Sequence, residues 1–348
     1  MDFPVYVICH TFNQSAYIID ALDGFCMQIT DFPYICIIMD DASTDGEQTV
    51  IRDYLNTHFC LDDKSLAKNE ESEDYVMTYA QHRENTNCYF AVFYLKYNHY
   101  SKNKEKSQYY SRWNAVKYIA MCEGDDYWTD SRKLQIQFDF LEDNPNYGFV
   151  YSDYSFYYQE NGLLRPSMIA RGEGPKIENF EQHLVLAGYI APPSWFYRSE
   201  LQILQEKYSE LDFIDTSYAF ALEVFLSTNV HCMMRDTCVR RVIGESASQS
   251  KCIYKKINYI KNVFAIQLYY ARKYSNSRDT INTITENYYS RNYPYLLINN
   301  DSHDISQIKR FVTRKDTDRI KTIIKKGMLR NAWSRKVLKL WIYYKYFV

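Results

Sequence analysis

Short apolar runs and helix-like segments alternate along the first 150 residues of this 348-residue chain. VYVIC at 5–9, YICIIM at 34–39 and YIAMC at 118–122 have the length and composition of buried strands. After the first run, apolar residues recur every three or four positions from Ile18 to Cys26, which is the period of a helix. Strands that alternate with helices favour an α/β fold, with a mostly parallel sheet and helices on both faces.

The same criteria give the next elements. Residues 87–98 (NCYFAVFYLKYN) and 147–153 (YGFVYSD) have strand character. Residues 60–87 are acidic, polar and poorly periodic, so we predict a long loop there. Helices are predicted over 108–117 and around 134–141.

Polar residues suggest where these helices begin. Asn13 or Ser15 is available as N-cap of the first helix, and Thr44 with Glu47 fits a capping box for the second. Asp130 is the expected cap of the third.

Composition is that of a folded soluble protein, with 24% charged and 46% hydrophobic residues. The nine cysteines form no CxxC pair and several lie in apolar runs, as in proteins of a reducing compartment. The N-terminus MDFPVYVICH has no basic region followed by a long apolar stretch, and no run approaches the ~20 apolar residues of a membrane span. We therefore expect a cytoplasmic protein.

Charge is unevenly distributed. Residues 309–345 carry 13 Lys and Arg against two Asp, a net charge of +11, so the rest of the chain carries −13. Trp333 and Trp341 are interleaved with these cations, which suggests an anionic partner, either a membrane surface or a nucleic acid. No nucleic-acid-binding motif accompanies the tail, which favours the membrane. We expect a catalytic domain over 1–245 and a helical, C-terminally basic extension over 246–348.

Polar motifs follow three of the predicted strands: HTFN at 10–13, DDASTDG at 40–46 and EGDDYW at 123–128. In α/β sheets, ligands bind beyond the carboxyl ends of the strands. We expect the three motifs to converge on one crevice although 109 residues separate the outer two.

The acids of these motifs have two interpretations. Asp125 and Asp126 are suited to hold Mg²⁺ or Mn²⁺ together with the oxygens of a diphosphate, or they cap the helix that follows. Asp40 and Asp41 accept hydrogen bonds from a base or a ribose, or they form the turn. No GxGxxG and no GxxxxGK[ST] is present, so a bound phosphate must rely on a metal. HExxH and GxSxG are absent as well.

HTFNQSAYIIDALDGFCMQ, ICIIMDDASTDG and YIAMCEGDDYWTDSRKLQIQFDFLEDNPNYGFVYSD together resemble the family 2 glycosyltransferases of bacterial capsule and O-antigen polysaccharide synthesis. The resemblance covers residues 1–155 and extends more weakly to about 250. It implies a GT-A fold and an inverting transfer of a sugar from a nucleotide diphosphate donor, expected to be UDP-linked, to a hydroxyl of a glycan or lipid-linked saccharide. It leaves the oligomeric state open.

The resemblance also assigns roles to residues. Thr11, Asn13 and either Asp40 or Asp41 would contact the nucleoside, and the acids Glu123, Asp125 and Asp126 would hold the ribose and the metal on the diphosphate. Asp215 would be the general base, its alternative role being an ordinary N-cap. Trp195 would stack on the acceptor sugar, or it is a buried structural residue.

One departure from the family concerns the Arg-Ile-His stretch of relatives, because Val242, Ile243 and Gly244 occupy that region here and the His near Ile243 is missing. Arg240 or Arg241 then meets the phosphates instead, or the metal is bound more weakly. Two rival functions remain: a catalytically silent protein that binds a glycan or nucleotide, and a sugar nucleotidyltransferase, whose glycine-rich N-terminal loop is missing here. The sequence also favours a location at the inner face of the cell membrane through residues 309–348.

Overall fold

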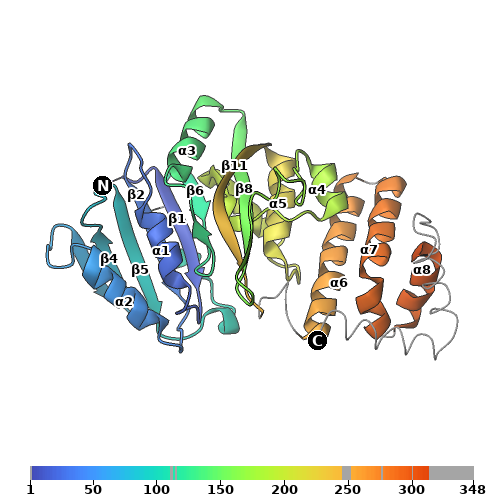
Figure 1. The fold of residues 1–348 in the computed structure, drawn as a ribbon, viewed down its shortest axis with the longest axis horizontal. Coiled ribbons are helices and arrows are strands. Elements are labelled where there is room, and N and C mark those ends of the chain that lie inside the picture. Colours follow the sequence, from blue (N-terminus) through green and yellow to red (C-terminus); the bar gives the residue numbers. More distant parts are fainter. Residues whose placement is uncertain are drawn as a thin grey trace. The chain divides into compact units, whose positions relative to one another are not determined.

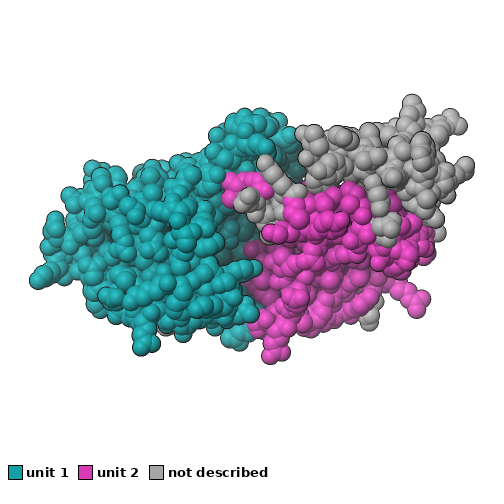
Figure 2. Space-filling view, turned by 90° about the horizontal axis from the view of Figure 1, so that it is seen from below, with its two compact units in different colours: residues 1–178, 189–207, 223–242 teal, residues 179–188, 208–222, 243–348 magenta. Residues whose placement is uncertain are grey.

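The computed structural model of the chain describes residues 2–109, 113, 116–244, 252–275, 277–299 and 301–312. The chain divides into two compact units (Figure 2). Unit 1 comprises 1–178, 189–207 and 223–242, and unit 2 comprises 179–188, 208–222 and 243–348. The expected domain boundary after residue 245 remains a prediction.

Unit 1 is built on one mixed sheet whose strands run in the order β3-β4-β5-β2-β1-β6-β10-β8-β11-β7, with β9 paired to β8. The four neighbours β5, β2, β1 and β6 are parallel, whereas β10 is antiparallel to β6 and β8. The strands are β1 (Val5–Thr11), β2 (Tyr34–Asp40), β3 (Ala67–Glu71), β4 (Tyr75–Gln81), β5 (Cys88–Leu95), β6 (Tyr118–Met121), β7 (Tyr127–Trp128), β8 (Tyr147–Tyr158), β9 (Leu163–Arg165), β10 (Phe196–Arg198) and β11 (Asn229–Val242).

The parallel strands hold the core of unit 1. Every residue of β2 and β5 is buried, as expected of strands that are covered on both faces. The α-helices of this unit are α1 (Ile18–Cys26), α2 (Glu47–His58) and α3 (Lys133–Asp143), and α1 lies beside α2 (Figure 1). The expected α/β fold is confirmed. Its parallel pairs lie among β5, β2, β1 and β6 and, farther along the sheet, between β8 and β11.

The predicted loop over 60–87 is wrong, because the segment contains the antiparallel hairpin β3–β4. Strand β4 pairs with β5, and β3 forms the edge of the sheet. The residues of β3 are AKNEE, and none of them is buried. Charged residues are common in edge strands, but this sequence has no apolar pattern from which a strand could be predicted. Of the predicted helix over 108–117, residues 110–112 and 114–115 lie outside the described residues, and Ser107–Tyr109 is a 3-10 turn.

The predicted caps of α1 and α2 are also wrong. The N-cap of α1 is Tyr17, and that of α2 is Gly46, whose φ of 93° is in the left-handed region. In both cases side chains expected to cap contact other parts of unit 1, as Asn13 does with Thr44 and Glu47 with Thr11. The N-cap of α3 is Arg132, whose N–H donates to Asp130 Oδ1 at 3.0 Å, so this helix begins near Asp130 as predicted.

Unit 2 is helical. Its helices are α4 (Phe180–Leu186), the first part of α5 (Thr216–Ser227), α6 (Ile253–Tyr270), α7 (Arg278–Asn299) and α8 (Ser302–Val312), with a π-helical turn at Ala271–Ser275. The short 3-10 segments of the chain are Tyr100–Lys102, Ser107–Tyr109, Pro192–Ser194 and Ser199–Lys207.

A second hydrophobic core joins α6, α7 and α8. Phe264 stacks on Tyr288 with ring centroids 3.8 Å apart, and Ile308 and Phe311 of α8 are buried in the same cluster. In the ranges that the structure describes, no helix is both long and apolar enough to cross a bilayer. Most of the basic tail, residues 313–348, lies outside the described residues.

Candidate active site

Three carboxylates follow strand β6 of unit 1. Glu123, Asp125 and Asp126, here called the acid cluster, each offer an oxygen within 4.8 Å of the others. Asp126 is 4% exposed, Asp125 is half-buried and Glu123 is exposed. The loop is anchored to β1, since the backbone N–H of Gly124 donates to the carbonyl of His10 at 3.1 Å. The three acids at the carboxyl end of β6 therefore differ in their exposure to solvent.

The acid cluster is costly to ionise. Burial raises the pKa of Asp125, although the neighbouring Arg240 and Arg241 act in the opposite direction. Burial also raises the pKa of Asp126, and the charges of Asp125 and Glu123 add to this. Such a site favours a bound cation, and three carboxylate oxygens on one turn are a donor set that fits Mg²⁺ or Mn²⁺. The residues present thus fit the divalent metal expected from the sequence.

Arg241 of β11 ties the acid cluster to the sheet. Its backbone N–H donates to the Asp126 carboxylate at 2.8 Å, and its Nε donates to the Asp125 carbonyl at 2.9 Å. Its Nη atoms donate to Gln159 and Asp20. The guanidinium is also flanked by three aromatic rings at 4.9 to 5.5 Å, those of Tyr17, Tyr127 and Tyr157. The side-chain donors of Arg241 therefore bind acceptors within the protein.

Thr11 and Asn13, at the end of β1, lie next to the acid cluster. A Cβ added to Gly124 would lie 2.7 Å from the Thr11 Cβ, so the two loops are in contact. Thr11 Oγ1 donates to the buried Glu47 carboxylate, and Asn13 Oδ1 accepts from the Thr44 N–H at 2.8 Å. The expected convergence of HTFN with EGDDYW is present.

Asp40 and Asp41 end β2 and are both buried. Asp40 Oδ1 accepts from Gln48 Nε2 at 2.6 Å. The Asp41 carboxylate accepts from the His99 N–H at 2.7 Å and from the Lys106 ammonium at 2.8 Å. Burial favours the neutral form of Asp41, but these donors outweigh it and lower its pKa. Asp41 thus holds the loop after β5 in place, and a nucleoside contact by either aspartate remains a prediction.

Sequence reasoning missed two residues that organise this site. Glu47 was assigned to a capping box, but its carboxylate accepts from Thr11 Oγ1, from the Gln14 N–H at 2.8 Å and from Ser43 Oγ at 2.8 Å. Arg241 was considered only as a phosphate contact. A glutamate that precedes an apolar helix face gives no signal of burial, since the partner loop is 36 residues away.

Asp215 lies in unit 2 at the start of α5. Its Oδ1 accepts from the Tyr218 N–H at 2.9 Å, which is the geometry of an N-cap, and its Oδ2 accepts from the Tyr259 hydroxyl at 2.5 Å. The capping alternative is therefore present in the structure. A cap does not exclude a second role, and the base assignment remains a prediction.

Trp195 of unit 1 is 2% exposed. Its Nε1 donates to the Ile190 carbonyl at 3.2 Å, and its ring lies edge-on to Phe149 at 5.5 Å. These are the surroundings of a structural tryptophan. The acceptor role has no support from this geometry.

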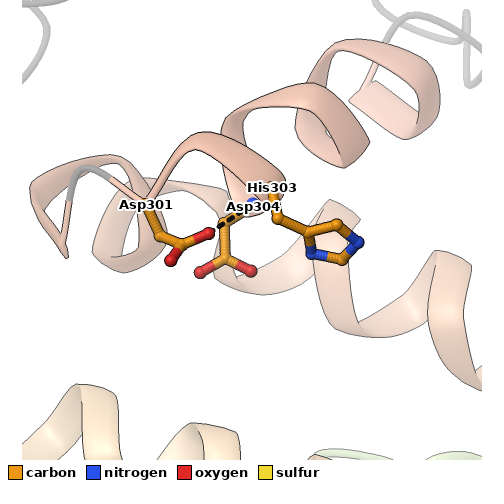
Figure 3. A group of neighbouring side chains, drawn as sticks. All are labelled: Asp301, His303 and Asp304. Atoms are coloured by element: carbon orange, nitrogen blue, oxygen red, sulfur yellow. Dashed lines mark hydrogen bonds between the residues drawn. The ribbon is translucent and has the colours of Figure 1, made fainter.

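A second group with metal-ligand chemistry lies in unit 2, where Asp301, His303 and Asp304 bring ligand atoms within 4.8 Å of one another (Figure 3). Asp301 Oδ1 accepts the Asp304 N–H at 3.0 Å, the dashed contact in Figure 3, and so caps α8. Asp304 Oδ2 is 3.0 Å from the Lys261 ammonium. Both carboxylates thus have structural partners, and the acid cluster of unit 1 is the better candidate.

Comparison with known proteins places the fold. No family model matches the chain. Three uncharacterised mycobacterial proteins, from Mycobacterium bovis and from two strains of Mycobacterium tuberculosis, are 30% identical over 139 residues, which is 40% of this chain and 32% of theirs. TarS of S. aureus superimposes with a TM-score of 0.52 and 13% identity, over all of this chain and 54% of TarS. A mannosyltransferase from Pyrobaculum calidifontis in complex with GDP-Man and Mn²⁺ superimposes with a TM-score of 0.49 and 14% identity, over 98% of this chain and 88% of the mannosyltransferase.

The match to TarS is a likeness of fold. The chain shares with TarS a mixed α/β sheet with flanking helices, and helices follow the sheet, as the sequence led us to expect. The chain spans about half the length of TarS and about a third of the curated mycobacterial relatives.

Proposed function

We propose that this protein is an inverting glycosyltransferase that moves a sugar from a nucleotide diphosphate donor to a hydroxyl of a glycan or lipid-linked saccharide, in the synthesis of a cell-surface polysaccharide. The observation that supports it best is the acid cluster at the carboxyl end of β6, in contact with the Thr11 loop of β1. Open α/β sheets bind their ligands at this edge. On this proposal a UDP-linked donor is expected.

The acid cluster would hold a divalent ion through Asp125 and Asp126. When bound, such an ion stabilises the charge that develops on the departing diphosphate. Arg241 keeps both residues in position, because it binds the loop through its backbone and its side chain. Thr11 and Asn13 would contact the nucleoside. Hydrogen bonds to Glu47 and Thr44 hold these two side chains in place.

The first test is calorimetric titration of UDP and a panel of other nucleoside diphosphates into the protein, with and without Mn²⁺. Metal-dependent binding of one nucleotide should be lost in Asp125→Asn and Asp126→Asn. Asp139→Asn, an exposed aspartate of α3, is the matched control and should bind as the wild type does. If no nucleotide binds, the proposal is wrong and a silent glycan-binding protein becomes the better assignment.

We propose Asp215 as the general base that accepts the proton of the acceptor hydroxyl. Asparagine caps a helix about as well as aspartate but cannot act as this base. Asp215→Asn should therefore melt at the wild-type temperature and bind donor normally while sugar transfer falls by about 100-fold or more. Normal transfer by this variant would leave Asp215 as a cap alone.

A further inference from the structure

Two adjacent arginines of β11 differ in what they contact. Successive side chains of a strand point to opposite faces. Arg241 is 5% exposed and its donors bind Asp20, Gln159 and the Asp125 carbonyl. Arg240 lies on the other face, with its guanidinium 5.3 Å from the centre of the Tyr189 ring. The two residues therefore have different roles.

Arg240 is the cation beside the acid cluster that has donors to spare. Its neighbour Arg241 donates its backbone N–H to the Asp126 carboxylate at 2.8 Å, which places this part of β11 beside the acid cluster. Burial alone would lower the pKa of the Arg240 guanidinium, but Tyr189, Asp126 and Asp125 raise it. Among the described residues, Arg240 makes a long hydrogen bond of 3.4 Å to the Arg241 carbonyl and contacts the Tyr189 ring. An arginine has five N–H donors, and its planar fork matches the oxygens of a phosphate.

We infer that Arg240 binds the diphosphate of the donor directly, next to the metal held by the acid cluster, while Arg241 is a positioning residue only. The inference rests on the proposed function and extends it, because it assigns the diphosphate contact to one of two neighbouring cations. Arg240 would then contact the diphosphate in place of the histidine that is missing near Ile243. The metal and Arg240 then share the charge of the two phosphates.

The test measures binding of UDP, UMP and inorganic pyrophosphate, each with and without Mn²⁺, to the wild type and to Arg240→Gln. The variant should bind UDP and pyrophosphate about tenfold more weakly or worse, since charge-assisted hydrogen bonds to phosphate are lost. Its affinity for UMP should change much less. Arg240→Lys should recover part of the loss, because it keeps the charge but not the fork. Arg235→Gln, on the same strand and ion-paired to Asp130, is the matched control and should behave as the wild type does.

Binding of Mn²⁺ alone distinguishes a phosphate contact from a structural role. Removal of a cation beside the carboxylates should leave the affinity for Mn²⁺ unchanged or higher in Arg240→Gln. Weaker Mn²⁺ binding, or equal losses for UDP and UMP, would show that Arg240 only shapes the acid cluster and would overturn the inference. Unchanged UDP affinity in the variant would also overturn it while leaving the proposed function in place. If the wild type binds neither UDP nor pyrophosphate, both fail together.

Discussion

The backbone N–H of Arg241 donates a 2.8 Å hydrogen bond to the carboxylate of Asp126, 115 residues earlier in the chain. A second hydrogen bond joins the Arg241 Nε to the Asp125 carbonyl at 2.9 Å. Strand β11 thereby fixes the conformation of the acid loop that follows β6. The geometry of the candidate metal site depends on both strands.

The first prediction concerns the stability that Arg241 supplies. In Arg241→Met the free energy of unfolding should fall by about 2–3 kcal/mol, because several hydrogen bonds of a buried cation are lost and their acceptors remain. Urea denaturation measures the change. Arg235→Gln removes an exposed ion pair to Asp130 and should cost no more than about 1 kcal/mol. Equal losses in the two variants would contradict the role assigned to Arg241.

The parts of the fold that the sequence predicted share one property. Strands β1, β2 and β6 are continuous apolar runs, and such runs are informative because burial on both faces leaves no room for polar residues. Strand β4 (YVMTYAQ) is only partly buried and β3 has no apolar pattern, so their pairing depends on contacts that no local window contains.

The position of the acids was predictable from the same kind of signal. Glu123, Asp125 and Asp126 directly follow an apolar run, at the edge of the sheet where ligands bind, and their role in binding stays a prediction. The capping box assigned to Glu47 is wrong, and the hydrogen bonds of Arg241 to the acid loop were not predicted, because their partners are 36 and 115 residues distant in sequence. No local rule contains such partners, so tertiary hydrogen bonds determine the positions of both side chains.

The second prediction tests the contact between the two loops. In Gly124→Ala the new Cβ would lie 2.6 Å from Gln14 Oε1 and 2.7 Å from the Thr11 Cβ, closer than real Cβ atoms approach. The Thr11 loop must shift, so metal-dependent nucleotide binding should weaken by about tenfold or more while the fold persists. Calorimetry gives the affinity and thermal melting checks the fold. Wild-type affinity would show that the nucleotide does not contact this loop.

The third prediction concerns pH. Lys133 is fully buried, with its Nζ 2.6 Å from Gln137 Oε1 and 4.5 Å from the centre of the Trp128 ring. Burial lowers its pKa from 10.5 to about 8. Between these two values the unfolded chain binds the extra proton, so this residue makes the folded state more stable as the pH rises from 8 to 10.5. Below pH 8 its full cost is present.

Lys133→Met removes that dependence. The stability of the variant relative to the wild type should be highest at pH 7 and should fall by up to about 3 kcal/mol by pH 10.5. Denaturation of both proteins over this range gives the difference, in which the titration of other groups cancels. A difference that stays flat with pH would mean that Lys133 is not held in a low-dielectric site.

The last prediction concerns the proposed attachment to a membrane surface. Residues 313–348 contain 11 Lys and Arg against two Asp, with Trp333 and Trp341 among them. Such segments bind anionic lipids, each cation near the surface contributing about 1 kcal/mol. A deletion that starts at 309 would remove Phe311, which is buried in the core of unit 2, so the truncation should begin after Val312.

The chain truncated after Val312 should no longer sediment with vesicles that contain phosphatidylserine, whereas the full chain should bind them and be released by salt, because the attraction is between charges. The full chain with Lys321, Lys325, Lys326, Lys336 and Lys339 changed to Gln keeps every aromatic residue and should bind far more weakly. Vesicles of phosphatidylcholine alone are the control for charge. Undiminished binding of the truncated chain would place any membrane contact elsewhere, and undiminished binding of the glutamine variant would make the aromatic residues, rather than the cations, responsible.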